Sequence, residues 1–164
     1  MEPVFIARQI VEKHWEYRKD LVMTFIDLEK AYDSVPRDRV WESLKQKDIG
    51  EEIIQMIKAM YSNCSSCVKT QVGRTGWFDI ENGLKQGSVL SPLLFILVMD
   101  DMLKATKEAY IGTRMNIILF ADDILIWGEN EKVVQEKLDV LKENIEKWGM
   151  KISVEKSKTM VMTR

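Results

Sequence analysis

Two adjacent aspartates, Asp122 and Asp123, interrupt an otherwise apolar run between residues 117 and 127. An ionised carboxylate in an apolar interior costs so much free energy that it protonates, pairs with a cation or binds a metal. The run is rich in Ile, Phe and Trp, so we predict two strands that fold back at Ala121 to Asp123. Both acids then lie at the tip of a hairpin, where neither charge is simply buried.

The tip of this hairpin is unusual because it lacks glycine, which two-residue hairpin turns favour. Two carboxylates about 4 Å apart repel each other by roughly 1 to 4 kcal/mol at a surface-like dielectric, and a divalent cation would turn that repulsion into attraction. Asp is also common in ordinary turns, where its side chain caps the local backbone. A purely structural role for the pair therefore stays open at this point.

A single globular domain fits the length and composition of the chain. Its 164 residues suffice to bury a sheet with covering helices, and 46% of them are hydrophobic and 30% charged. The net charge of −2 argues against nonspecific nucleic-acid binding through a broad basic face. No apolar stretch is as long as a membrane span and the first twenty residues do not resemble a signal peptide, so we expect an intracellular protein with no membrane partner.

The cysteines and the one histidine do not suggest a metal site. Cys64 and Cys67 form a lone C-x-x-C, and a structural zinc site would need two further ligands, whereas His14 is far away in the sequence. We interpret the cysteine spacing as chance. His14 lies in a polar segment and is interpreted as a solvated side chain.

A third acid, Asp27, follows the strand-like run 21–26. The order of predicted elements suits an α+β fold in which helices pack on one face of an antiparallel sheet. If the strand before Asp27 lies next to the hairpin of Asp122 and Asp123, three carboxylates meet at one edge. Such a set suits Mg²⁺, and two Mg²⁺ ions can activate a 3′-oxygen and neutralise a leaving pyrophosphate.

The remaining elements are predicted from periodicity and capping residues. We expect helices at 4–18, after Pro36 up to Gly50, over 53–61 with Ile53, Ile57, Met60 and Tyr61 on one side, over 93–107 after Ser91 and Pro92, and after Asn130 with a stripe of Val134, Leu138, Leu141, Ile145 and Trp148. We expect one hairpin over 68–80 that turns at 73–76, and another over 150–162 that turns at 155–158.

Two further features have functional and structural interpretations. Gly83 and Gly87 lie in a loop before a helix, which is a weak signal for phosphate or nucleotide binding and is also typical of an ordinary loop. Asp100 and Asp101 are adjacent in a predicted helix, where neighbouring side chains do not face each other. We interpret them as solvated or capping charges rather than a metal site.

Four motifs in order and spacing resemble the palm of a reverse transcriptase, most closely that of non-LTR (LINE-like) retrotransposons. They are F-I-D-L-E-K-A-Y-D-S-V at 25–35, G-L-K-Q-G-S-V-L-S-P-L-L-F at 83–95, F-A-D-D at 120–123 and G-M-K-I-S-V-E-K-S-K at 149–158. The resemblance begins at about residue 4 and covers nearly the whole chain. It implies the palm fold and places the chain in the nucleus or cytoplasm.

The resemblance also implies roles for individual residues. Asp27 and Asp122 would bind two Mg²⁺ ions, or Mn²⁺ in their place, with Asp123 as the third acid and the Leu28 carbonyl as a further ligand. Tyr32 would lie under the incoming sugar and select deoxynucleotides, although a packed core tyrosine is the alternative. Gln86 and Gly87 would line the nucleotide pocket. Lys156 would lie near the departing phosphate as a proton donor, and a solvated turn lysine is the alternative.

The chain also departs from the family pattern. Ser153 stands where the family often has Asn, and no segment resembles the basic fingers, the primer grip, the thumb or the endonuclease. We therefore expect residues 1–164 to be a palm from a larger polymerase, with the missing segments of the parent polyprotein as partners.

Three functions follow from these observations. The first is RNA-directed DNA polymerase activity, in which the palm adds dNTPs to a primer on an RNA or DNA template; we expect the isolated fragment to be inactive. The second is a catalytically silent or domesticated palm that acts as a protein-interaction module. The third is a metal nuclease that uses the same acids and would cleave unprimed nucleic acid.

Overall fold

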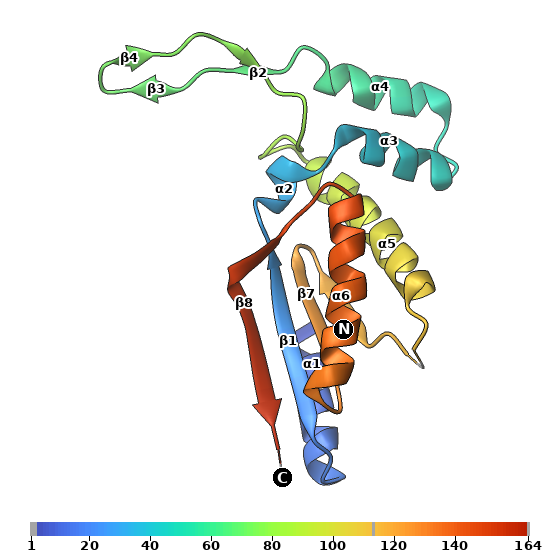
Figure 1. Cartoon of the computed structure of the whole chain (residues 1–164). Helices are drawn as coiled ribbons and strands as arrows, with labels where there is room; N and C mark the ends of the chain where they lie inside the picture. The colour runs from blue at the N-terminus through green and yellow to red at the C-terminus, as the bar shows by residue number, and fades with distance from the viewer. Residues whose placement is uncertain (1–2, 113, 164) are drawn as a thin grey trace. The chain divides into compact units, whose positions relative to one another are not determined.

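A computed structural model describes residues 3–112 and 114–163, which form two compact units (Figure 1). The first unit comprises residues 1–31 and 99–164, so it is built from both ends of the chain, and the second comprises residues 32–98. The elements in chain order are α1 (Pro3–Glu16), β1 (Leu21–Leu28), α2 (Ala31–Ser34), α3 (Arg37–Gln46), α4 (Glu51–Tyr61), β2 (Ser65–Ser66), β3 (Lys69–Thr70), β4 (Gly73–Arg74), β5 (Phe78–Asp79), α5 (Ser91–Ala109), β6 (Ile117–Phe120), β7 (Asp123–Gly128), α6 (Glu131–Lys147) and β8 (Ile152–Met162).

The first unit is organised around a four-stranded antiparallel sheet with strand order β6-β7-β1-β8. Strand β1 lies between β7 and β8, and all its residues except Phe25 and Asp27 are buried. A strand that is paired on both sides and covered on both faces has a continuous apolar sequence. This explains why residues 21–26 are mostly apolar. The predicted antiparallel α+β class is confirmed, but β1 extends to Leu28 and therefore includes Asp27 instead of ending before it.

The C-terminal segment corrects one sequence prediction. Residues 152–162 form a single strand, β8, instead of a hairpin that turns at 155–158. Both halves of β8 pair with β1, from Leu28↔Ile152 at one end to Leu21↔Met162 at the other, with a register shift between Phe25 and Asp27. The polar residues that suggested a turn therefore lie in an irregularity within one strand.

Helices of the first unit pack on both faces of its sheet. Met23 packs with Ala7, Ile10 and Val11 of α1, whereas its neighbour Thr24 lines a cavity together with Leu138 of α6. Successive strand residues point to opposite faces, so α1 and α6 cover opposite sides. Within the described residues, no helix is long and apolar enough to cross a membrane.

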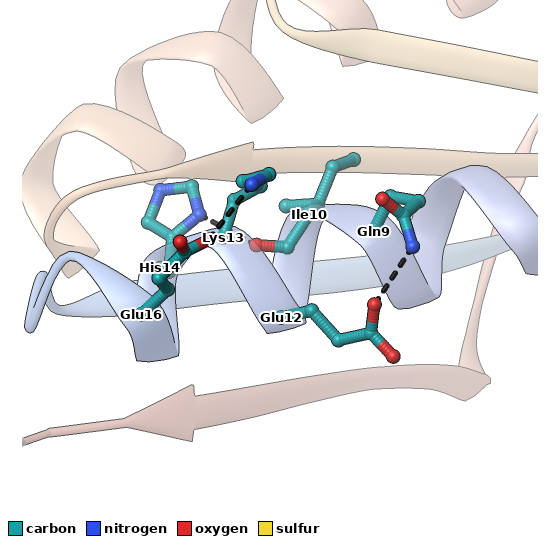
Figure 2. A network of polar contacts seen from close by, with 6 residues as sticks. All are labelled: Gln9, Ile10, Glu12, Lys13, His14 and Glu16. Atoms are coloured by element: carbon teal, nitrogen blue, oxygen red, sulfur yellow. Dashed lines mark hydrogen bonds and ion pairs between the residues drawn. The ribbon is translucent and has the colours of Figure 1, made fainter.

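Helix α1 carries a polar face with short-range contacts (Figure 2). Lys13 contacts Glu16 at 2.7 Å, and the hydrogen bond to this carboxylate raises the pKa of Lys13. The His14 Nδ1 atom lies 2.8 Å from the Ile10 carbonyl oxygen, and the side chain is half-buried. The prediction of a solvated His14 is therefore wrong, because the imidazole is bound to its own helix.

Helix α6 begins as predicted at Asn130, whose side chain accepts a hydrogen bond of 2.9 Å from the Val133 N–H. Three members of the predicted apolar stripe are buried, namely Val134, Leu141 and Ile145. The helix also buries Lys137, whose ammonium donates a hydrogen bond of 2.8 Å to the Trp127 carbonyl. Desolvation lowers the pKa of Lys137, and the charge of Glu129 partly opposes that shift.

The second unit holds α2 to α4, the first part of α5 and a two-stranded ribbon. Helix α3 ends at Gln46, and Gly50 caps the start of α4 instead of ending α3. Helix α4 buries Ile54, Ile57 and Tyr61, so Ile53 and Met60, predicted on the apolar side, are about half exposed.

The ribbon of the second unit turns earlier than the sequence predicts. Strands β2 and β5 pair, and β3 pairs with β4 through Lys69↔Arg74 and Thr70↔Gly73. The turn is therefore at residues 71–72, and residues 73–74 are already in a strand. All residues from 68 to 82 are exposed, so the ribbon contributes no side chain to a core.

Helix α5 begins at Ser91 as predicted, and Asp100 is exposed. Asp101 is only 7% exposed and lies in the middle of the helix, so the interpretation of both acids as solvated or capping charges is wrong for Asp101. Val98, Met99 and Met102 flank it in the buried part of the same helix.

Candidate active site

The Asp122–Asp123 hairpin forms as predicted, with β6 and β7 joined by Ala121 and Asp122. Ala121 adopts φ of +53°, the left-handed conformation that a tight turn usually assigns to glycine or asparagine. Asp123 is the first residue of β7 and pairs with Phe120, so only Asp122 lies in the turn itself. Asp122 is half-buried and Asp123 is exposed.

Asp27 and Asp123 lie at the same end of neighbouring strands. The β1–β7 ladder ends at Ile26↔Ile124, which places Asp27 and Asp123 next to each other just beyond it. By strand alternation both side chains belong to the sheet face that carries Phe25. They line one cavity of about 600 Å³, together with Lys156. The predicted convergence of the two acid-bearing elements is thus found for these two acids, whereas Asp122 does not line this cavity.

The cavity is apolar around its charged groups. Phe25 and Phe120 contribute aromatic rings that are 45% and 59% exposed. Arg8 of α1 also lines it and is paired with Glu12 at 2.6 Å. Exposed aromatic rings beside carboxylates form a surface that suits a ligand with both apolar and cationic or metal-bound parts.

Lys156 is the cation that faces Asp27. Its Nζ atom lies 3.5 Å from Asp27 Oδ1, with 68% of the Lys156 side chain and 30% of the Asp27 side chain exposed. An ion pair this exposed contributes at most about 1 kcal/mol. Lys156 therefore lies beside Asp27 and within strand β8 instead of a turn, and its place near the departing phosphate stays a prediction.

Asp27 and Asp123 have the donor atoms that a divalent cation prefers. Carboxylate oxygens are the ligands that Mg²⁺ and Mn²⁺ prefer, and Asp27 and Asp123 share one cavity, so the donor chemistry fits. Across residues 3–112 and 114–163, however, no three His, Cys, Asp or Glu side chains come together in an arrangement that could hold an ion. The three-acid set of Asp27, Asp122 and Asp123 stays a prediction.

Leu28 and Ser153 adjoin Asp27 in the sheet. Leu28 is the buried last residue of β1 and pairs with Ile152. Ser153 pairs with Asp27 and is 8% exposed, so the residue that departs from the family pattern lies directly beside the first acid.

Three predicted nucleotide-binding residues lie in the second unit. The Tyr32 ring stacks on buried Phe95 with a centroid distance of 4.5 Å, which agrees with its alternative interpretation as a packed tyrosine. Gln86 donates a hydrogen bond of 3.0 Å to Asp33. Gly87 has φ of +82° and open space around the position of a Cβ atom. Their nucleotide-binding roles stay predictions.

Arg37, which the sequence did not single out, holds the glycine loop in place. Its guanidinium donates to the Gly83 carbonyl at 3.1 Å and to the Tyr61 carbonyl at 3.0 Å, and it lies over the Tyr61 ring. Gly83 itself is required, because a Cβ atom there would lie 2.6 Å from the Asp33 carbonyl oxygen. The loop that contains Gln86 and Gly87 is therefore anchored at its start.

Cys64 and Cys67 are free and half-buried. The interpretation of their spacing as chance stays a prediction.

Ser157 is a second residue that the sequence did not single out. Its hydroxyl accepts a hydrogen bond of 3.3 Å from the Asp27 N–H and donates one of 2.7 Å to the Ser153 carbonyl. Ser157 lies in the polar run 155–158, which interrupts the alternation of β8. This run was the one sequence signal for Ser157, and it predicted a turn instead.

The family model described as "Reverse transcriptase (RNA-dependent DNA polymerase)" matches residues 2–164. Among curated relatives, the chain is 27% identical over 148 residues to the Pol polyprotein of the type-1 retrotransposable element R2 of Nasonia vitripennis, covering 88% of this chain and 14% of the relative. It is 29% identical over 152 residues to the RNA-directed DNA polymerase from mobile element jockey of Drosophila funebris. That match covers 85% of this chain and 16% of the relative. The chain thus spans about one-seventh of these relatives' length.

Solved structures share the fold. A telomerase from Candida albicans, in complex with a TWJ fragment of telomeric RNA, superposes with a TM-score of 0.75 at 12% identity, covering 99% of this chain and 30% of the telomerase chain. The corresponding telomerase complex from Candida tropicalis superposes with a TM-score of 0.71 at 18% identity. That superposition covers 94% of this chain and 29% of the telomerase chain. At these identities the likeness concerns the arrangement of helices and strands alone.

Proposed function

This chain belongs to the reverse transcriptase (RNA-dependent DNA polymerase) family, and from that membership we propose that it is the catalytic palm of an RNA-directed DNA polymerase. The reaction joins a deoxynucleotide to the 3′ end of a primer. The observation that carries the proposal is the placement of Asp27 and Asp123 at the same end of two neighbouring strands, in one cavity with Lys156. The non-LTR retrotransposon relatives support it.

In this proposal the acids hold divalent cations, which reverse transcriptases generally use. Asp27, Asp122 and Asp123 are the carboxylate ligands for two Mg²⁺ ions, with Mn²⁺ as a substitute, and the Leu28 carbonyl adds a ligand. When bound, the ions activate the primer 3′-oxygen and neutralise charge on the leaving pyrophosphate. A substrate that displaces water from the apolar walls around the acids would lower the local dielectric and so strengthen its electrostatic attraction to the protein.

The other residues bind, orient or donate a proton. Lys156 is proposed to donate a proton to the departing pyrophosphate, a step for which its ammonium group is suited. Tyr32 is proposed to exclude a 2′-hydroxyl from the sugar site, and Gln86 and Gly87 to line the nucleotide pocket. Stacking on Phe95 restricts the orientation of the Tyr32 ring within the second unit.

The proposed partners are dNTPs and a primer on an RNA or DNA template. The description of the family as RNA-dependent DNA polymerases supports an RNA template. Because the chain spans about one-seventh of its curated relatives, we propose that fingers and thumb segments complete the polymerase. We expect the 164 residues alone to be inactive, and we propose that the enzyme works in the nucleus or cytoplasm.

Primer extension on an RNA template tests the assignment. In a full-length protein that contains this chain, Asp27→Asn and Asp122→Asn should each lower the Mg²⁺-dependent rate by at least about a hundredfold, since each removes a charged ligand of the ions. Asp139→Asn, a charge change on the exposed side of α6, is the matched control and should leave the rate unchanged. Full extension by Asp27→Asn would falsify the proposal.

A catalytically silent palm that binds a protein partner is the second candidate. One observation favours it, namely that no three metal-ligating side chains are grouped within residues 3–112 and 114–163. It predicts that the full-length protein incorporates no dNTP on primed RNA while it retains tight binding to a protein partner. Cleavage of unprimed nucleic acid would instead favour the nuclease interpretation.

A further inference from the structure

Strand β8 contains an irregularity directly opposite Asp27. Asp27 pairs with Ser153, and Phe25 pairs with Lys158, so β8 advances five residues while β1 advances two. Three extra residues of β8 are therefore accommodated at this point, next to the candidate active site. Bulges of this kind locally redirect side chains and are frequent beside active sites.

Where the bulge begins, Asp27 pairs with Ser153, and its N–H donates a hydrogen bond to a side chain of β8, that of Ser157. The Ser157 hydroxyl accepts the Asp27 N–H at 3.3 Å and donates to the Ser153 carbonyl at 2.7 Å. One side chain thus ties the two ends of the bulge to each other and to β1. Lys156, the residue before Ser157, lies 3.5 Å from the Asp27 carboxylate.

We propose that Ser157 is a positioning residue, whose hydroxyl closes the bulge in β8 and thereby holds the Lys156 ammonium beside Asp27. The proposal rests on the proposed function for the role of Lys156 in DNA synthesis. The geometric part, which concerns Ser157, Lys156 and Asp27 alone, is independent of it.

The chemistry required at position 157 is specific. Alanine would leave the Asp27 N–H without its acceptor and the Ser153 carbonyl without its donor. Threonine keeps the hydroxyl, and Ser157 lines a cavity of about 630 Å³ with Thr24 and Thr159, so the added methyl group has room. Threonine at position 157 should therefore preserve the position of Lys156 beside Asp27, whereas alanine should not.

A zero-length carbodiimide crosslink measures the geometry without any enzymatic activity. The reagent joins a carboxylate to an amine that contacts it, so the Asp27–Lys156 amide can be quantified by peptide mass spectrometry in the 164-residue chain. The Lys13–Glu16 pair, at 2.7 Å, serves as the internal standard. Ser157→Ala should lower the Asp27–Lys156 yield about fivefold, the factor expected from one lost hydrogen bond. Ser157→Thr should restore it.

Two control variants accompany this measurement. Lys158→Gln removes the same charge as Lys156→Gln two residues away and should leave the crosslink intact, whereas Lys156→Gln abolishes it. Ser65→Ala makes the same chemical change at an exposed serine of β2 and should have no effect. An unchanged Asp27–Lys156 yield in Ser157→Ala, with the standard also unchanged, overturns the proposal.

A double-mutant cycle in primer extension then tests whether Ser157 acts through Lys156. In the full-length protein, Ser157→Ala should lower kcat about fivefold with little change in KM for dNTP, and Ser157→Thr should recover it. In a Lys156→Ala background, Ser157→Ala should cost less than about twofold more, because the group it positions is gone. Losses that simply multiply would overturn the positioning role.

The outcomes separate the two proposals. If the full-length protein makes no DNA but Ser157→Ala still lowers the crosslink yield, the proposed function fails and the geometric role of Ser157 holds. If primer extension depends on Asp27 but Ser157→Ala leaves the Asp27–Lys156 crosslink yield unchanged, the proposed function holds and this inference fails.

Discussion

At the scale of single residues, Lys137 carries a charge that the fold opposes. It is 2% exposed on α6, and its ammonium donates a hydrogen bond to the Trp127 carbonyl. Desolvation is the main cause of its lowered pKa, with Glu129 acting in the opposite direction. The folded chain therefore releases this proton at a lower pH than the unfolded chain does.

The stability of the fold should rise at alkaline pH because of Lys137. Between the lowered pKa of the folded state and the unfolded value of 10.5, the unfolded state binds more protons, so the free energy of unfolding increases with pH in that window. Below the window this residue contributes no pH dependence. Urea denaturation of the native chain and of Lys137→Met should show the alkaline rise only in the native chain. Lys132→Met, an exposed lysine on α6, is the control and should keep the rise.

Two glycines with the same backbone conformation should respond differently to alanine. Gly83 and Gly87 have φ of +84° and +82°, so either substitution costs about 1 to 2 kcal/mol of backbone strain. At Gly83 the added Cβ would also meet the Asp33 carbonyl oxygen at 2.6 Å, whereas nothing lies within 4 Å at Gly87. Gly83→Ala should therefore lose about 1 to 3 kcal/mol more than Gly87→Ala in urea denaturation. Equal losses would contradict the close approach.

The convergence of two candidate acids was predictable from residue chemistry. An acid after an apolar run and an acid pair in a hairpin are local patterns, and strand pairing brought Asp27 and Asp123 together. The position of Asp122 away from their cavity was not predictable, because adjacent residues diverge according to the exact turn. The contact of Ser157 was also not predictable from the sequence, because its hydroxyl bonds to a residue 130 positions away.

At the scale of elements, the ribbon of β2 to β5 should be the first segment to be cut by a protease. Residues 68–82 are all exposed, and a two-stranded ribbon without a packed face is marginally stable. Strands β3 and β4 pair through two residue pairs, and one of them places Lys69 opposite Arg74. Because both side chains are positively charged, this pair destabilises the ribbon. Limited trypsin digestion should cleave after Lys69 and Arg74 before any site in α3 or α4.

Mass spectrometry of the early fragments checks this prediction. The double variant Lys69→Gln/Arg74→Gln should lose those fragments and survive longer under the same conditions. First cleavage within α6 would show instead that the ribbon is held more firmly than its exposure indicates.

Element boundaries followed the sequence where local chemistry decides them. Asn130 caps α6 as predicted, because capping depends on neighbouring backbone groups, and α5 begins at Ser91, the residue predicted as its N-cap. Strand β8 was misjudged because its polar segment resembles a turn, and only the pairing of both of its halves with β1 makes it one strand. The buried side of α4 shifted by one residue to Ile54 because both sides of that helix carry apolar residues.

At the scale of the whole molecule, the class of fold was predictable and the division into two units was not. The predicted hairpins, separated by helices, favour an antiparallel sheet covered by helices. The first unit, however, is assembled from residues 1–31 and 99–164, with the second unit inserted between them. No composition change marks the insertion, since apolar and charged residues occur in both segments.

The central place of β1 in its sheet has a consequence for synthesis on the ribosome. Its partners β7 and β8 begin at Asp123 and Ile152, so β1 leaves the exit tunnel long before either strand exists. At about 5 to 20 residues per second, the nascent chain carries an unpaired, apolar strand for roughly 5 to 20 seconds. During that interval β1 is a target for chaperones and for misassembly with other nascent chains, so expression yield should depend on how well the host shields it.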